Sequence, residues 1–240
     1  MMKKKEQIII AFVFSFFFLT SLSAQGVGKI FFREDFRTLE RWEFVENREV
    51  RKATLYSIIS DQGHTYLKAE SRSSASALRY VKTFNVYEYP RMRWRWKVEN
   101  VYEKGDATKK QGDDYPIRVY VVFRFNPQKV GFLKKLKYKT AGLFYSGEIP
   151  DSALNYIWAN KWHQANIIKN PYRKEARMIL LQKGKGNVGL WIDEDVNILE
   201  DYRKAFREDP PERASVVIMN DSDNTGESSV SYIDFIEIYR

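Results

Sequence analysis

Cysteine is absent from the 240-residue sequence. This absence excludes disulfide bonds, thiolate metal sites, a thiol nucleophile and a lipid-modified N-terminal cysteine. Histidine is scarce as well, because the chain holds only His64 and His163, and their separation does not match a zinc motif or a histidine-based triad. The fold must therefore be held by its core, and zinc or thiol chemistry is not expected.

Several motifs typical of enzymes and of nucleic-acid-binding proteins are also missing. The sequence contains no G-x-S-x-G nucleophile elbow and no nucleic-acid-binding motif. Gly184–Gly189 fits G-x-G-x-x-G, but it precedes a strand-like stretch instead of opening a helix, so we expect a hairpin turn there and no nucleotide site. Internal repeats and Pro/Gly/Ser-rich linkers are lacking, which favours a single domain.

Long hydrophobic runs are confined to the N-terminus. Three lysines precede an apolar run at residues 8–19, and small residues follow it. This is the plan of a secretory signal peptide, and the run is shorter than the roughly 20 residues that span a membrane. We expect residues 1–24 to be removed after Ser23 or Ala24, leaving one domain at 25–240, without a transmembrane segment, in the periplasm or outside the cell. A retained anchor is the alternative.

Acidic residues are fewer than basic ones, with 31 Asp and Glu against 40 Lys and Arg, a net charge of +9. In an exported protein this excess favours a polysaccharide or another anionic envelope component as the partner, and not nucleic acid. Lysines and apolar residues are interspersed at 129–139. This segment is predicted to be a solvated insertion between strands, with contact to a membrane surface as the alternative.

Val, Ile, Tyr, Phe and Trp recur in short segments between turn residues, which is typical of β-strands. The clearest alternation is at 91–98, where four apolar residues share one face and four cations share the other. The pattern predicts an all-β fold, a jelly-roll-like antiparallel β-sandwich with one short helix at 196–207. The expected strands are 29–36, 53–60, 65–71, 77–83, 91–98, 117–125, 155–159, 164–169, 175–182, 188–193, 214–220 and 229–239.

Three groups of carboxylates stand out as candidates for chemistry. Asp113 and Asp114 are adjacent, Asp221 and Asp223 lie in a D-S-D-N-T-G stretch, and Asp234 lies within the last expected strand. Oxygen ligands at alternate positions followed by glycine resemble the first half of a calcium loop. Calcium held by Asp221, Asp223 and Asp234 is therefore a candidate cofactor, and an Asx-turn that bonds its own backbone is the alternative.

The same carboxylates are candidates for catalysis. Glycoside hydrolysis uses two carboxyl groups, and Asp113 or Asp114 with Asp221 or Asp223 would form such a pair if the two loops meet. The sequence does not show that they meet, and pairs of acidic residues are common in soluble proteins. A non-catalytic role is therefore favoured.

Cations and an exposed aromatic ring are the expected ligand contacts. Arg93 and Arg95 lie on the polar face of the strand at 91–98. A tryptophan can stack on the apolar face of a sugar ring, and Trp162 is the candidate for an exposed ring. Arg93, Arg95, Arg118 and Trp162 are the predicted ligand-binding residues.

Five stretches of the chain carry a family resemblance. They are Trp94–Trp96, Gly112–Phe123, Tyr156–Ala159, Asn197 with Glu200–Tyr202, and Asn220–Gly226. Together they resemble a bacterial family described as domain of unknown function 3047, over nearly the whole chain after the signal peptide. The resemblance implies an exported bacterial protein and implies no particular activity. The last strand, at 232–238, also looks like the closing strand of jelly-roll carbohydrate-binding modules, which supports the sandwich fold.

Three hypotheses for function follow. The first is a non-catalytic envelope protein that binds a polysaccharide or a similar anionic ligand. The second is a glycan-active hydrolase or lyase that uses the aspartate pair. The third is a structural subunit that binds another envelope protein.

Overall fold

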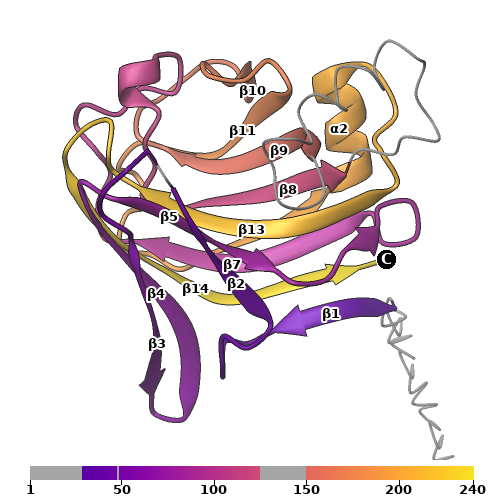
Figure 1. Cartoon of the computed structure of the whole chain (residues 1–240), viewed down its shortest axis with the longest axis horizontal. Coiled ribbons are helices and arrows are strands. Elements are labelled where there is room, and N and C mark those ends of the chain that lie inside the picture. Colours follow the sequence, from indigo (N-terminus) through magenta and orange to yellow (C-terminus); the bar gives the residue numbers. More distant parts are fainter. Residues whose placement is uncertain (1–28, 48, 125–149) are drawn as a thin grey trace, which may run out of the picture.

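The computed structural model describes residues 29–47, 49–124 and 150–240. Figure 1 shows their strands in two curved layers with an α-helix near one end. The expected signal peptide at 1–24 and the lysine-rich segment at 129–139 lie outside the described residues, so both stay predictions. No helix in the described part of the chain is long and apolar enough to cross a membrane.

The strands form two sheets, called sheet A and sheet B below. Sheet A contains β1 (Ile30–Glu34), β3 (Leu55–Asp61), β4 (His64–Arg72), β7 (Arg91–Val98), β12 (Ile192–Asn197) and β14 (Ser228–Tyr239). Sheet B contains β2 (Trp42–Glu46), β5 (Ala75–Tyr80), β6 (Phe84–Asn85), β8 (Arg118–Arg124), β9 (Pro150–Ala159), β10 (Ile167–Lys169), β11 (Ala176–Lys183) and β13 (Arg213–Asp221). The order is β12-β7-β14-β4-β3 in sheet A, with β1 beside β14, and β10-β11-β9-β8-β13-β5-β2 in sheet B, with β6 beside β13.

The predicted β-sandwich is confirmed, and among the described strands one pairing departs from the antiparallel pattern. β9 and β11 run parallel. Parallel neighbours need a crossover connection, and residues 160–175, which include β10, supply it. The expected hairpin at Gly184–Gly189 is wrong, because this segment leads from β11 in sheet B to β12 in sheet A.

Large aromatic side chains fill the space between the sheets. Trp94 and Trp96 of β7 are fully buried, and their ring centroids lie 5.6 Å from Tyr156 and 5.9 Å from Trp158 of β9. The predicted alternation of β7 is confirmed, since its apolar face is buried and its cations point away from the core. In a chain without cysteine, this aromatic packing and the buried aliphatic residues around it stabilise the two layers.

The predicted helix is present as α2 (Ile198–Phe206). It begins after Asn197, whose side-chain oxygen accepts a hydrogen bond from the Glu200 N–H at 3.1 Å. Tyr202 is buried and packs against Phe123 of β8 with ring centroids 4.6 Å apart. The helix therefore closes one end of the core.

A β-bulge in β14 decides where Asp234 points. The pairing of β14 with β7 shifts between Ile233 and Phe235, which leaves Asp234 as the extra residue. Strict alternation would place Asp234 on the same face as Ile236, which is in the core. The bulge instead turns its carboxylate to the outer face of sheet A, where it contacts Arg95.

Glu194 of β12 makes the free energy of unfolding depend on pH. Its carboxylate accepts hydrogen bonds from Trp96 Nε1 (3.2 Å) and Gln182 Nε2 (2.7 Å), and burial raises its pKa. The folded state therefore holds the proton more tightly than the unfolded state, so stability falls as pH rises from the ordinary glutamate range through the raised pKa. We expect Glu194→Gln to raise the melting temperature at pH 7 by about 2–4 °C.

Melting curves of both proteins between pH 4 and pH 8 test this expectation. The advantage of the Glu194→Gln variant should shrink towards pH 4, because the wild-type carboxylate is then protonated in both states. A difference that does not change with pH would contradict it.

Candidate functional site

Two loops that carry predicted aspartates meet beside sheet B. The short 3-10 helix η1 (Lys110–Gly112) leads into the acidic pair before β8, and β13 ends at Asp221. The Asp114 carboxylate is fully buried and accepts hydrogen bonds from the backbone N–H groups of Asn224 (3.3 Å) and Thr225 (2.6 Å). The D-S-D-N-T-G turn therefore folds around the Asp114 side chain.

Arg118 brings a positive charge into this acidic cluster. It lies on β8 opposite Met219 of β13, and only 4% of it is exposed. Its guanidinium donates a hydrogen bond to Asp221 Oδ2 and lies 3.8 Å from Asp113 Oδ1. The other oxygen of Asp221 accepts a hydrogen bond from the Tyr115 N–H at 3.2 Å. Arg118 thus ties both loops to the sheet.

The acidic cluster, Asp113, Asp114, Asp221 and Asp223, carries more negative charge than Arg118 balances. Burial raises the pKa of Asp113 and of Asp221, while Arg118 acts in the opposite direction. Burial and the neighbouring Asp114 raise the pKa of Asp223. Carboxylate oxygens of Asp114, Asp221 and Asp223 lie within 4.8 Å of one another. These three carboxylates, two of them buried, could hold a metal ion, and their oxygen donors suit a hard cation.

A separate pocket of about 500 Å³ opens on the outer face of sheet A. It is called the aromatic pocket below. The strands β4, β7 and β14 form its floor. The β3–β4 turn and the residue before β12 form its rim. Its lining residues are Asp61, Gln62, His64, Tyr66, Arg95, Lys97, Trp191 and Asp234.

Aromatic rings form one side of this pocket. The ring centroids of Tyr66 and Trp191 lie 5.7 Å apart, and the Tyr232 ring lies 5.6 Å from Tyr66 and 6.2 Å from Trp191. Lys97 Nζ lies 4.6 Å from the centroid of Tyr232 and 5.6 Å from that of Trp191. The Arg95 guanidinium lies 5.6 Å from Trp191. These cation–π contacts join two cations to the rings of Trp191 and Tyr232.

Hydrogen-bonding groups form the other side. Asp234 Oδ1 lies 2.6 Å from His64 Nε2, and Arg95 Nη1 donates to Asp234 Oδ2 at 3.5 Å. His64 follows a two-residue hairpin turn in which Gln62 and Gly63 have φ values of 49° and 82°. Positive φ at both central residues is the geometry of a tight β-hairpin, so the turn fixes the rim of the pocket.

Comparison with known proteins identifies the family of this chain but assigns no activity to it. A family model described as "Protein of unknown function (DUF3047)" matches residues 40–237. The chain belongs to the DUF3047 family. This confirms the resemblance seen in the sequence. No curated protein sequence matches the DUF3047 chain.

Three solved structures illustrate what the DUF3047 chain is similar to. The enzymatically active domain of bacteriophage CBA120 tailspike protein 4 is 6% identical with a TM-score of 0.35, and the match covers 84% of this chain and 20% of that one, so the chain spans about a fifth of the tailspike domain. A family 30 carbohydrate-binding module of a Clostridium thermocellum cellulase is 9% identical (TM-score 0.38, 81% and 84% covered). Trichoderma harzianum endoglucanase 3, from family GH12, is 10% identical (TM-score 0.40, 82% and 90% covered).

The DUF3047 structure separates the predicted metal ligands. Asp221 and Asp223 lie together, and Asp114 is the third carboxylate beside them. Asp234 instead lines the aromatic pocket with His64. Calcium at Asp221 and Asp223 stays a prediction, with Asp114 in the position expected for Asp234.

The predicted ligand-binding residues of the DUF3047 chain fall in different places. Arg95 lines the aromatic pocket. Arg93 pairs at 2.8 Å with Glu237, whose side chain is buried, and Arg118 is buried in the acidic cluster. Trp162 is 72% exposed and lies outside the aromatic pocket.

Sequence reasoning missed most of the aromatic pocket. Tyr66, Lys97 and Trp191 come from segments that are distant in the chain and adjacent only in the folded sheet. The one usable signal was the polar face of β7, which places Lys97 beside Arg95. No pattern of residue spacing predicts that Trp191 lies on this face of the sheet.

Proposed function

We propose that this protein is a non-catalytic glycan-binding protein of the cell envelope, and that the aromatic pocket holds the glycan. The proposal rests on one observation: Trp191 and Tyr66 line the same open pocket as several charged hydrogen-bonding groups. An apolar ring face and converging polar groups are what a pyranose needs, because a sugar has an apolar face and a rim of hydroxyl groups.

The polar side of the pocket fits several hydroxyl groups at once. Arg95 and Lys97 donate, Asp61 and Asp234 accept, and His64 can do either. Asp234 is already held by His64 and Arg95, so little side-chain entropy is lost when a ligand binds. The two cations also fit a carboxylate or sulfate substituent, in agreement with the predicted anionic ligand.

The location of the protein is part of the same proposal. The signal peptide expected at residues 1–24 would carry the domain to the periplasm or the cell exterior, where polysaccharides are abundant. A partner-binding role in the envelope remains the third hypothesis, with no feature of the described residues that favours it over glycan binding.

The acidic cluster favours a second candidate, a glycan-active hydrolase or lyase. The structure brings Asp113, Asp114, Asp221 and Asp223 together, which is the condition that the sequence could not test. Glycosidase carboxylates must flank a bound sugar. Here Asp114 is enclosed by backbone N–H groups, and Asp221 is held by Arg118 with 2% of it exposed. This enclosure supports a structural role for the cluster, so the non-catalytic function is preferred.

Two neighbouring arginines of β7 provide a matched test of the binding site. Arg95 lines the aromatic pocket, whereas Arg93 points to the same side of the sheet and pairs with Glu237. We expect Arg95→Gln to weaken glycan binding about tenfold and Arg93→Gln to leave it within about twofold, because only Arg95 can contact the ligand.

The measurement is isothermal titration of both variants with fragments of β-1,3-glucan, β-1,4-glucan, xylan and polygalacturonate. Melting temperatures of the two variants control for folding. Loss of binding in Arg93→Gln but not in Arg95→Gln would move the site away from the pocket, and release of new reducing ends from any polymer would favour the hydrolase or lyase.

A further inference from the structure

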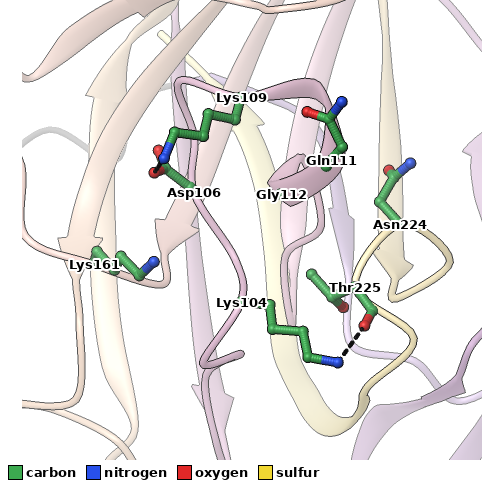
Figure 2. A pocket seen from close by; sticks show the side chains of 8 residues that line it. All are labelled: Lys104, Asp106, Lys109, Gln111, Gly112, Lys161, Asn224 and Thr225. Carbon is green, nitrogen blue, oxygen red and sulfur yellow. Dashed lines mark hydrogen bonds and ion pairs between the residues drawn. The ribbon is translucent and has the colours of Figure 1, made fainter.

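A second pocket, of about 360 Å³, lies beside the D-S-D-N-T-G turn and is rich in lysine. Figure 2 shows side chains from three loops and η1 around it. It is called the lysine pocket below. Its lining residues are Lys104, Asp106, Lys109, Gln111, Gly112, Lys161, Asn224 and Thr225.

Positive charge exceeds negative charge in the lysine pocket. Lys109 Nζ lies 3.3 Å from Asp106 Oδ2. Lys104 Nζ donates to the Thr225 carbonyl at 3.4 Å, as the dashed line in Figure 2 shows, and forms no ion pair with a carboxylate of the described residues. Lys161 forms no ion pair within the described residues, although its charge acts on Glu103. Three ammonium groups thus face one carboxylate in this pocket.

The loop that carries two of these lysines is held in place. The Asp106 N–H donates to the Gly112 carbonyl at 2.8 Å, and the Asp106 side chain accepts from the Thr108 hydroxyl at 2.7 Å. The hydroxyl and the N–H of Thr108, together with the neighbouring Lys109, lower the pKa of Asp106 to about 2, so it stays ionised. A Cβ at Gly112 would lie 2.5 Å from the Asp106 nitrogen, so only glycine permits this close approach.

The negative charge of the acidic cluster does not open into the lysine pocket. Asp114 accepts hydrogen bonds from the backbone N–H groups of Asn224 and Thr225, and these two residues line the lysine pocket. The four aspartates of the cluster are absent from the lining. A ligand in the pocket therefore meets the lysines, together with the amide of Gln111 and the side chains of Asn224 and Thr225.

We propose that the lysine pocket binds one anionic substituent, a carboxylate or a sulfate ester, of an acidic polysaccharide. Ammonium groups supply charge-assisted hydrogen bonds to such oxygens, and the amide of Gln111 adds a neutral donor. The lysine pocket shares no lining residue with the aromatic pocket. The two sites can therefore be tested one at a time, and either can fail alone.

The test compares dextran sulfate, polygalacturonate and uncharged dextran as probes. The variant carries Lys104→Gln, Lys109→Gln and Lys161→Gln. The control carries Lys52→Gln, Lys82→Gln and Lys174→Gln, which remove the same charge from exposed positions outside both pockets. A Trp191→Ala variant reports on the aromatic pocket.

We expect wild-type protein to bind at least one charged probe at low salt and not dextran. The pocket variant should bind that probe about tenfold more weakly than wild type, and the control less than about threefold more weakly. Preference for dextran sulfate or for polygalacturonate identifies the substituent. Equal weakening in both triple variants, or no binding of either charged probe, would overturn the proposal without affecting the aromatic pocket.

Discussion

Replacing Arg118 by glutamine is expected to lower the free energy of unfolding by about 3–5 kcal/mol. Arg118 is buried and donates to Asp221, and its guanidinium also faces Asp113. Glutamine removes the charge, and two buried carboxylates then remain without the cation that offsets their desolvation. The melting temperature should fall by roughly 10 °C, because each kcal/mol corresponds to about 2–4 °C in a domain of this size.

A double variant separates the charge effect from a packing effect. Arg118→Gln with Asp221→Asn removes a buried positive and a buried negative charge together, so it should recover at least about half of the lost stability. Urea unfolding of the wild type, both single variants and the double variant completes the cycle. If Arg118→Gln stays within about 1 kcal/mol of the wild type, or the second substitution makes it worse, Arg118 does not hold the acidic cluster together.

Replacing Trp191 by alanine is expected to weaken glycan binding by about 30-fold or more, which corresponds to about 2 kcal/mol. The rings of Trp191 and Tyr66 provide the stacking surface of the aromatic pocket, and Arg95 and Lys97 lie beside Trp191. Without the indole a sugar loses its apolar contact, and the two cations lose the ring that orients them. The fold should be retained, since Trp191 is not one of the buried core residues.

Trp162→Ala is the matched control for this prediction. Trp162 is 72% exposed, lies outside the aromatic pocket and was the tryptophan that the sequence predicted to bind ligand. Isothermal titration with the glycan fragments named above should give wild-type affinity for Trp162→Ala. The reverse result, with binding lost in Trp162→Ala and kept in Trp191→Ala, would restore the sequence prediction and reject the pocket.

The fold was predictable where one face of a strand is apolar. β7 alternates without interruption, so its buried face and the β-sandwich followed from the sequence. β2 was missed because most of its residues are exposed at the edge of sheet B, where burial does not impose a pattern. The parallel pairing of β9 with β11 depends on the path of the chain and leaves no local signal.

The acidic cluster was predictable in its residues but not in its assembly. Asp114 comes just before β8 and Asp221 ends β13, and these strands are antiparallel neighbours in sheet B. That adjacency brings the loops together, and it cannot be read from residues so far apart in the chain. The bulge at Asp234 is a similar case, because one extra residue in β14 reverses the face that alternation assigns.

The ligand residues were the least predictable part. The four cations of β7 indicated a basic face, but side-chain carboxylates pair with most of them. Arg91 pairs with Asp195, Arg93 with Glu237 and Lys97 with Glu99. Composition counts the cations and does not show their partners, so the face is less positive than its sequence suggests.

The most direct test of glycan binding in the aromatic pocket is an NMR titration that follows the indole N–H signals of the 6 tryptophans. Signals are assigned by single substitution, and the β-1,3-glucan, β-1,4-glucan, xylan and polygalacturonate fragments are added in turn. We predict that at least one fragment shifts the Trp191 signal in a saturable manner and leaves the Trp162 signal in place. A fragment that shifts Trp162 and not Trp191, or a panel that shifts neither, would contradict the proposed site.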